Sequence, residues 1–431
     1  MFKKGENVDK YIQLKNKRIG DGQPCYIIAE MSANHGGDFN HALEIVYAAA
    51  ESGANCIKLQ TYTADTITMN SKKEHFIIDD GLWKGENLYS LYQKAYTPWD
   101  WHPRIKEEAE KLGLDFLSTP FDPTAVNFLE QVGVEFYKIS SFEVVDIPLL
   151  KAVAVTGKPI LLSVGMASES EIAAAVGAIR KHGGQVPHDA RAPHNRLATL
   201  NRRALHDRRV PLNLHVPHDR RALHDARAPR DRRTLRDRRA LHDRRAPLRG
   251  LALDNLILLK CSSAYPAAPA DMNLLTLQYL KQAFNAAVGL SDHSMGSLSA
   301  CTAVALGATV IEKHFCTGRA KKTPDSEFSM EPKEFKEMVE NIRMVEQSLG
   351  KVSFEPTAGE AVSRLHRKSI FVTADVKKGD TFTPDNIRVI RPAQGIPPSH
   401  YDEALGKAAT TDIEAGTPLK HAHIGGYAPN S

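Results

Sequence analysis

Short apolar runs alternate with amphipathic stretches along most of the chain. The amphipathic stretches, such as 41–52, 101–112 and 168–181, carry apolar residues at helical spacing. The runs between them are almost continuously apolar, which is typical of strands buried on both faces of a parallel sheet. Eight runs have this character: 26–30, 56–60, 115–119, 136–140, 159–163, 256–260, 286–291 and 310–314.

Eight alternating strand and helix units favour a closed (β/α)8 barrel, a fold of the α/β class. The main alternative is an open doubly wound sheet, but no GxGxxG turn follows any of the runs. We therefore predict a TIM barrel over 22–349, preceded by a leader at 1–21.

The pattern changes after the predicted barrel to short strands separated by turns. A linker at 350–364 precedes apolar segments at 369–372 and 387–390. This spacing is typical of a small α/β module, which we place at 365–428.

An arginine-rich hexapeptide repeat interrupts the barrel pattern at 185–250. It holds 18 Arg and 7 Asp without Lys or Glu, a balance of +11, whereas the rest has 38 basic and 44 acidic residues, a balance of −6. A six-residue period places no apolar stripe on a helix, so we expect a disordered insert between the fifth helix and the sixth strand. Arginine clusters leave non-specific nucleic-acid binding open, but without aromatic residues we expect no specific nucleic-acid site.

Composition narrows the class of protein. Apolar residues make up 42% and charged residues 25%, which is the balance of a folded globular chain. No apolar run approaches the roughly 18 residues of a membrane helix, and the start lacks the apolar core of a signal peptide. Five widely spaced cysteines indicate free buried thiols. We therefore expect a cytoplasmic protein without a membrane segment.

Polar and ionisable side chains gather at the predicted carboxyl ends of the strands, where a barrel places its active site. Lysines and hydroxyls there match a substrate phosphate or carboxylate, and two histidines on neighbouring strands match a divalent metal. Asp292 and Glu312 are expected to face the helices and to pair with Lys or Arg. The strand-end residues are Glu30, Lys58, Thr119, Lys138, Ser141, Glu143, Ser163, Tyr265, Ser291, His293 and His314.

These residues lie in motifs that resemble the sialic acid synthase family, enzymes that condense phosphoenolpyruvate with an amino sugar. The module after the barrel resembles the antifreeze-like SAF domain of that family, and the resemblance covers about 20–182 and 252–428. The stretch LWKGENLYSLYQKAYTPWDWH (82–102) is more similar to pseudaminic acid synthases than to N-acetylneuraminate synthases. The motifs include IIAEMSANHGG (27–37), IKLQTYTADT (57–66), STPFD (118–122), YKISSFEV (137–144), GLSDHS (289–294), IEKHF (311–315) and, in the module, SIFVTADVKKGDTFTPDNIRVIRP (369–392).

The resemblance implies a C–C bond-forming transferase. It would join phosphoenolpyruvate to the open-chain aldehyde of a 2,4-diacetamido-2,4,6-trideoxy-altrose and release phosphate. The resemblance also implies Mn2+ or Mg2+ on His293 and His314, and a domain-swapped homodimer in which Arg391 reaches the partner's active site. The positions that match the phosphoenolpyruvate cradle are Lys58, Thr119, Lys138, Ser141, Ser163 and Ser291, and those that match sugar and acid/base positions are Glu30, Glu143, Tyr265 and Asp325.

Two enzyme alternatives stay open. Within the family, the chain could be an N-acetylneuraminate or legionaminate synthase. Outside that reaction, a barrel lyase or aldolase would use Lys58 or Lys138 to form a Schiff base.

Overall fold

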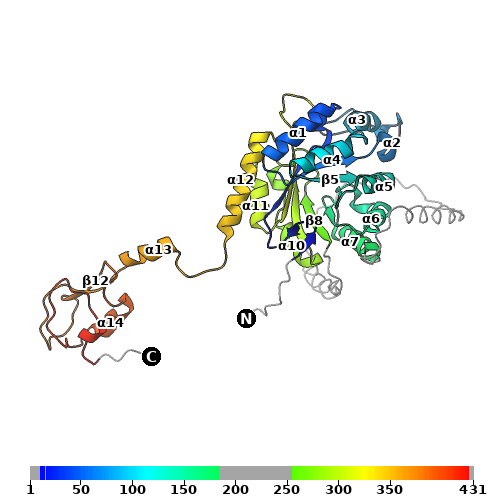
Figure 1. Ribbon diagram of the computed structural model, residues 1–431. Helices are drawn as coiled ribbons and strands as arrows, with labels where there is room; N and C mark the ends of the chain where they lie inside the picture. The colour runs from blue at the N-terminus through cyan, green and yellow to red at the C-terminus, as the bar shows by residue number, and fades with distance from the viewer. Residues whose placement is uncertain (1–9, 15, 184–254, 427–431) are drawn as a thin grey trace, which may run out of the picture. The chain divides into compact units, whose positions relative to one another are not determined.

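The computed structural model describes residues 10–14, 16–183 and 255–426, which form two compact units, Met1–Gly350 and Lys351–Ser431 (Figure 1). The predicted insert at 185–250 lies outside the described residues, so its disorder and its nucleic-acid binding stay predictions. In the described ranges, none of the helices combines the length and the apolar composition that crossing a bilayer requires.

The first unit is an eight-stranded parallel barrel, and Figure 1 shows its helices around the outside of the strands. Hydrogen bonds link the strands in the order β5-β4-β3-β10-β9-β8-β7-β6, and the two end strands lie side by side, so the barrel is nearly closed. The predicted (β/α)8 fold is confirmed, and each strand end differs from its predicted position by at most one residue. The strands are β3 (Tyr26–Glu30), β4 (Cys56–Thr61), β5 (Asp115–Pro120), β6 (Tyr137–Ile139), β7 (Ile160–Ser163), β8 (Leu256–Cys261), β9 (Ala287–Asp292) and β10 (Val310–His314).

Local sequence explains where the outer helices begin and end. Asp122 accepts hydrogen bonds from the backbone N–H groups of Thr124 and Ala125 at the start of α5, and Pro123 occupies the first helical position. Gly133 ends this helix in the left-handed conformation, at a φ of 75°. The helices of the barrel layer are α1 (Phe39–Glu51), α4 (Trp101–Lys111), α5 (Pro123–Val132), α6 (Ile147–Ala154), α7 (Glu169–Gly183), α10 (Thr276–Phe284), α11 (Leu298–Ala305) and α12 (Pro332–Leu349). The connection from β4 to α4 also carries α2 (Ala64–Ile67) and α3 (Leu88–Ala95).

A β-hairpin covers the amino-terminal end of the barrel. Its strands β1 (Tyr11–Gln13) and β2 (Arg18–Gly20) bury Ile12, Leu14 and Ile19. The sequence analysis placed no element in this leader, so the hairpin is an addition to the predicted fold. The three side chains pack on apolar residues from the first halves of the strands, namely Tyr26, Ile28, Cys56, Leu117, Phe136, Leu161, Ile257, Leu259, Ala287 and Val310.

The second unit has a small core of its own. Its strands β11 (Ser369–Val372) and β12 (Ile387–Ile390) pair antiparallel, and α14 (Tyr401–Ala404) follows them. Their buried residues include Ile370, Phe382 and Leu419. The predicted linker contains a short helix, α13 (Ala358–Ser363).

Gly289 on β9 provides a test of the barrel packing. A Cβ there would lie 2.6 Å from Leu259 Cδ2 and 2.6 Å from the carbonyl oxygen of Val310. Because the second contact is with backbone, we expect Gly289→Ala to lower the free energy of unfolding by about 1–3 kcal/mol, measured by urea unfolding. The control Gly177→Ala, on an exposed position of α7 with no atom within 4 Å of the added Cβ, should be neutral or stabilising by about 0.5–1 kcal/mol. Equal stability of Gly289→Ala and the parent would contradict this packing.

Candidate active site

Inside the barrel, a layer of polar side chains lies next to the apolar cluster that the hairpin covers, on the side of the carboxyl ends of the strands. Side chains two residues apart on a strand share a face, so a residue two positions after a member of that apolar cluster can also point into the barrel. Four such pairs are Ile28 with Glu30, Cys56 with Lys58, Phe136 with Lys138, and Val310 with Glu312. The strand period therefore places two lysines and two glutamates in one layer.

These four residues, which we call the ion-pair cluster, are Glu30, Lys58, Lys138 and Glu312. Lys58 Nζ lies 2.7 Å from Glu30 Oε2 and 3.8 Å from Glu312 Oε2. Lys138 Nζ donates to Glu312 Oε1 at 3.1 Å. None of the four residues is more than 3% exposed. Two positive and two negative charges balance, which permits their burial.

Neighbouring polar side chains orient the ion-pair cluster. Lys58 Nζ donates to Thr119 Oγ1 at 3.2 Å. The Ser291 hydroxyl donates to Glu312 Oε1 at 2.9 Å. Gln60, which the sequence analysis did not select, donates through Nε2 to Glu30 Oε1 at 3.1 Å.

The prediction that Glu312 faces the helices is wrong. Glu312 and His314 are two residues apart on β10, so both face the barrel interior. That alternation was readable from the sequence, because His314 was itself placed at the site. Asp292 does pair with a lysine as predicted, since Lys313 Nζ donates to its Oδ2 at 2.7 Å.

The two glutamates of the ion-pair cluster differ in acidity. Burial raises the pKa of Glu30 above its ordinary value; the Lys58 ammonium opposes this rise and the Glu312 carboxylate adds to it. Burial also disfavours ionised Glu312, but the ammonium groups of Lys138 and Lys58 outweigh it and lower the pKa. Glu30 is therefore the carboxyl that more readily takes up a proton, while Glu312 stays ionised.

Two histidines lie at the ends of β9 and β10, with ring centroids 5.4 Å apart. His293 Nδ1 is 2.6 Å from the carbonyl oxygen of Ser262, which fixes the ring and leaves Nε2 for another partner. His314 Nδ1 is buried without a hydrogen bond to any described residue, and Asp325 Oδ2 lies 4.0 Å from it. Burial lowers the pKa of His293 to about 4, and burial together with His293 lowers the pKa of His314 well below its ordinary value. Both rings are therefore neutral.

Neutral imidazoles with an unpaired buried nitrogen fit a divalent cation. The Ser262 carbonyl gives His293 the supporting hydrogen bond that metal-binding histidines commonly have. Among the described residues, no group of three or more His, Cys, Asp and Glu side chains is arranged to hold an ion. The protein would therefore supply two imidazoles and leave the other positions to substrate and water.

Aromatic rings and a buried carboxyl border the histidines. The Tyr265 ring centroid lies 4.3 Å from that of His293, and the Phe328 ring lies 4.9 Å from His314. Asp325 accepts a hydrogen bond from the backbone N–H of Ala33 at 3.1 Å. Burial raises the pKa of Asp325 although hydrogen bonds oppose the rise. The structure thus brings Tyr265 and Asp325 to the two histidines.

The remaining predicted residues have separate surroundings. The hydroxyls of Ser141 and Ser263 are 3.0 Å apart. The Ser163 hydroxyl is buried without a hydrogen-bond partner in the described part of the chain. Burial raises the pKa of half-buried Glu143, whose carboxylate accepts a hydrogen bond from Ser140.

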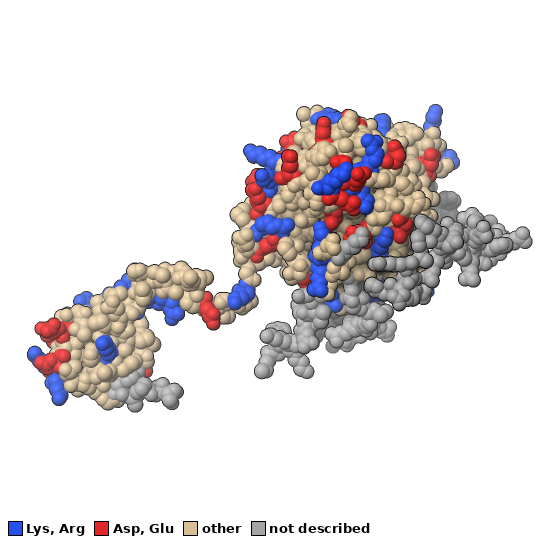
Figure 2. Space-filling view, viewed as in Figure 1, with Lys and Arg blue, Asp and Glu red and all other residues tan. Residues whose placement is uncertain are grey.

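Arg391 belongs to the second unit, where it directly follows β12 and is exposed. Arg391 is therefore not among the site residues that the barrel unit supplies. Figure 2 shows basic and acidic side chains intermingled on the face of the barrel unit in view, without a broad basic area.

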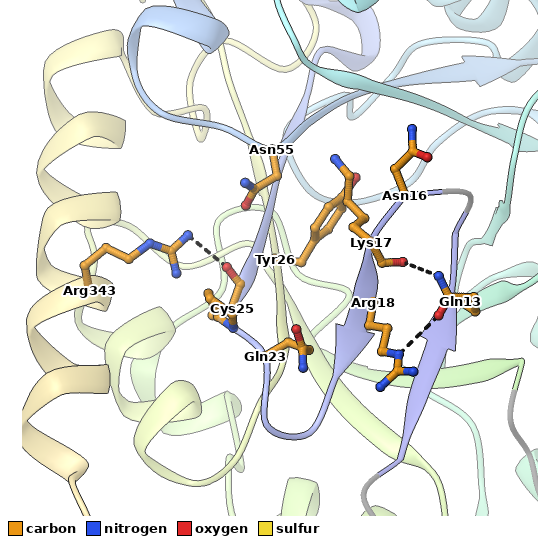
Figure 3. Close-up of a pocket in the computed structure, with 10 residues that line it drawn as sticks. Gln13, Asn16, Lys17, Arg18, Gln23, Cys25, Tyr26, Asn55 and Arg343 are labelled. Carbon is orange, nitrogen blue, oxygen red and sulfur yellow. Dashed lines mark hydrogen bonds between the residues drawn. The ribbon is translucent and has the colours of Figure 1, made fainter.

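A different cavity, of about 610 Å³, lies at the amino-terminal end of the barrel beside the hairpin (Figure 3). The three cations that line it have partners: Lys17 pairs with Asp115 at 2.7 Å, Arg343 pairs with Glu346 at 2.9 Å, and Arg18 donates to Gln13 Oε1 at 3.2 Å. Because barrel chemistry occurs at the opposite end, we assign the site to the ion-pair cluster and the histidines.

Comparison with known proteins identifies a family for the barrel and a domain type for the second unit. The sequence model of the NeuB family matches residues 45–187 and 243–354, and that of the SAF domain matches 367–425. The chain is 38% identical to the pseudaminic acid synthase of Helicobacter pylori over 399 residues, 92% of this chain and 97% of that protein. It is 36% identical over 397 residues to the pseudaminic acid synthase of Campylobacter jejuni, 92% of this chain and 96% of that protein.

A solved structure of a related enzyme has a similar fold. The N-acetylneuraminic acid (sialic acid) synthetase of Leptospira borgpetersenii superposes with a TM-score of 0.61 at 30% identity, covering 83% of this chain and 96% of that one. These matches span both the barrel and the second unit, and they confirm the predicted resemblance. The chain therefore belongs to the NeuB family and carries a SAF domain after its barrel.

Proposed function

We propose that the chain is an enzyme that condenses phosphoenolpyruvate with a 2,4-diacetamido-2,4,6-trideoxy-altrose aldehyde and water, giving a nonulosonic acid and phosphate. This is the reaction of a pseudaminic acid synthase. The observation that carries the proposal is the ion-pair cluster beside two neutral histidines at the carboxyl end of the barrel. The two relatives named pseudaminic acid synthase support the choice of sugar.

Phosphoenolpyruvate brings a carboxylate and a phosphate, so it needs fixed cations and hydroxyl donors. Lys58 and Lys138 supply the cations, and the hydroxyl of Ser163, which has no hydrogen-bond partner among the described residues, can donate to a ligand. Thr119, Ser141 and Ser291 complete the cradle. Burial raises the pKa of Glu30, which makes its carboxylate a stronger base.

The chemistry joins C3 of phosphoenolpyruvate to the aldehyde carbon and leaves positive character at C2. Glu312, held ionised by two lysines, is the carboxylate that stabilises this charge. Water then adds at C2, with Glu30 or Glu143 accepting its proton, and the C2–O bond to phosphate breaks. A divalent ion on His293 and His314, Mn2+ or Mg2+, would polarise the aldehyde oxygen.

The sugar is assigned to Tyr265 and Asp325 in the barrel, with Arg391 contributed by the SAF domain of a second copy. The exposure of Arg391 on its own unit is compatible with such a contribution. The working enzyme would then be a domain-swapped homodimer.

Phosphate release from phosphoenolpyruvate, measured with each candidate sugar, tests the proposed function. We expect the highest kcat/KM with the diacetamido trideoxy sugar and a product whose mass equals sugar plus pyruvate. Faster turnover of N-acetylmannosamine would favour an N-acetylneuraminate synthase, the activity named for the Leptospira structure. Borohydride trapping of a lysine adduct would instead favour the Schiff-base aldolase.

Removal of metal should abolish turnover and leave the fold intact. Two imidazoles hold an ion weakly enough for EDTA to remove it, and the described residues contain no group of three or more ligands that would tie the fold to an ion. We expect phosphate release to fall to background in EDTA and to return with Mn2+ or Mg2+, with an unchanged circular dichroism spectrum. His293→Ala should remain inactive after metal is added. Full turnover in EDTA would contradict the metal assignment.

Arg391→Ala should raise the KM for the sugar while the KM for phosphoenolpyruvate stays within about twofold. Loss of one charged hydrogen bond predicts a change of about 10- to 100-fold. Arg388→Ala, also exposed and on β12 itself, is the matched control and should leave both constants unchanged. An unchanged sugar KM in Arg391→Ala would count against the swapped dimer.

A further inference from the structure

Residues 77–87 of the β4–α4 connection form an arm that places one tryptophan beside the site. Ile77 and Asn87 bridge antiparallel, and Ile78 and Glu86 are linked by a backbone hydrogen bond of 2.9 Å. The turn between them presents Trp83. Leu82, its neighbour, is 41% exposed, whereas Trp83 is half-buried. The arm thus turns a single large aromatic side chain inward.

Trp83 docks on residues that border the two histidines. Its indole Nε1 donates to the carbonyl oxygen of Pro324 at 3.2 Å. Its ring centroid lies 6.2 Å from that of Tyr265 and 6.5 Å from that of Phe328. We call these three side chains the aromatic wall. Since Tyr265 lies on His293 and Phe328 on His314, the wall borders the place where the aldehyde would react.

The parts of the wall formed by Trp83 and Phe328 favour methyl groups over hydroxyls. The only polar atom of the indole is already bonded to Pro324, so Trp83 presents carbon to its surroundings. Phe328 has no polar side-chain atom. A sugar hydroxyl placed against such a surface loses its water without gaining a partner, whereas a methyl group gains by leaving water.

We propose that Trp83 is a specificity-determining residue that selects sugars with apolar substituents. The inference rests on the proposed function and deepens it. The diacetamido trideoxy sugar carries a methyl group at C6 and an acetamido group at C4, where N-acetylmannosamine carries hydroxyls. Trp83 forms the apolar surface against which the C6 methyl group and the acetyl methyl group of the C4 acetamido substituent pack.

Steady-state kinetics of Trp83→Ala test this role, with Leu82→Ala as the matched control from the same arm. We expect Trp83→Ala to raise the KM for the diacetamido sugar about 10- to 100-fold and to leave the KM for phosphoenolpyruvate within about twofold. N-acetylmannosamine, measured as a substrate or as a competitive inhibitor, should change much less. Trp83→Phe keeps the apolar surface but loses the hydrogen bond to Pro324, so it should retain most of the discrimination.

Several results would overturn the inference. Equal losses for both sugars in Trp83→Ala would make Trp83 a general support of the arm. A larger effect of Leu82→Ala, or an unchanged KM in Trp83→Ala, would remove Trp83 from the sugar site. If Trp83→Ala does not fold, Trp83→Phe provides the test. Complete loss of discrimination between the two sugars in Trp83→Phe would contradict a role for the apolar surface. Failure of the parent enzyme to release phosphate with any of these sugars would reject the proposed function itself.

Discussion

A lysine ammonium can stay charged inside a closed barrel only if carboxylates lie beside it, because moving an ion out of water costs several kcal/mol. The ion-pair cluster meets this condition with two lysines and two glutamates from β3, β4, β6 and β10. The eight-stranded ring must form before the charges from these four strands meet. The fold and the candidate chemistry therefore depend on the same contacts.

The barrel separates stability from chemistry along its axis. At the amino-terminal end, the hairpin and the first halves of the strands bury a cluster of apolar side chains. One layer further along, charged and hydroxyl side chains occupy inward positions on several strands, and the histidines lie at the strand ends. A deep polar layer for the anion and an outer aromatic wall for the sugar would let two unlike substrates meet at the histidines.

Much of this arrangement was predictable from the sequence. The eight strands follow from apolar runs of regular length, and the strand ends identify the polar layer. Glu312 was missed, although counting by two from His314 places it inside. The pairing of Lys58 with Glu30 was not predictable from local pattern, because it depends on the register in which β3 and β4 pair. Three-residue strands such as β1 are too short to show a hydrophobic period. The position of Trp83 was also not predictable, because it lies in a connection without a regular pattern.

The most direct test of the account is the affinity for phosphoenolpyruvate, measured by isothermal titration calorimetry on folded protein. Lys58→Met and Lys138→Met should each raise the Kd about 10- to 100-fold, the value of one charge-assisted hydrogen bond. Lys111→Met, at an exposed position of α4, should bind as the parent does. If both buried-lysine variants fold and bind phosphoenolpyruvate with the parent's affinity, the ion-pair cluster is not the anion site and the account is wrong.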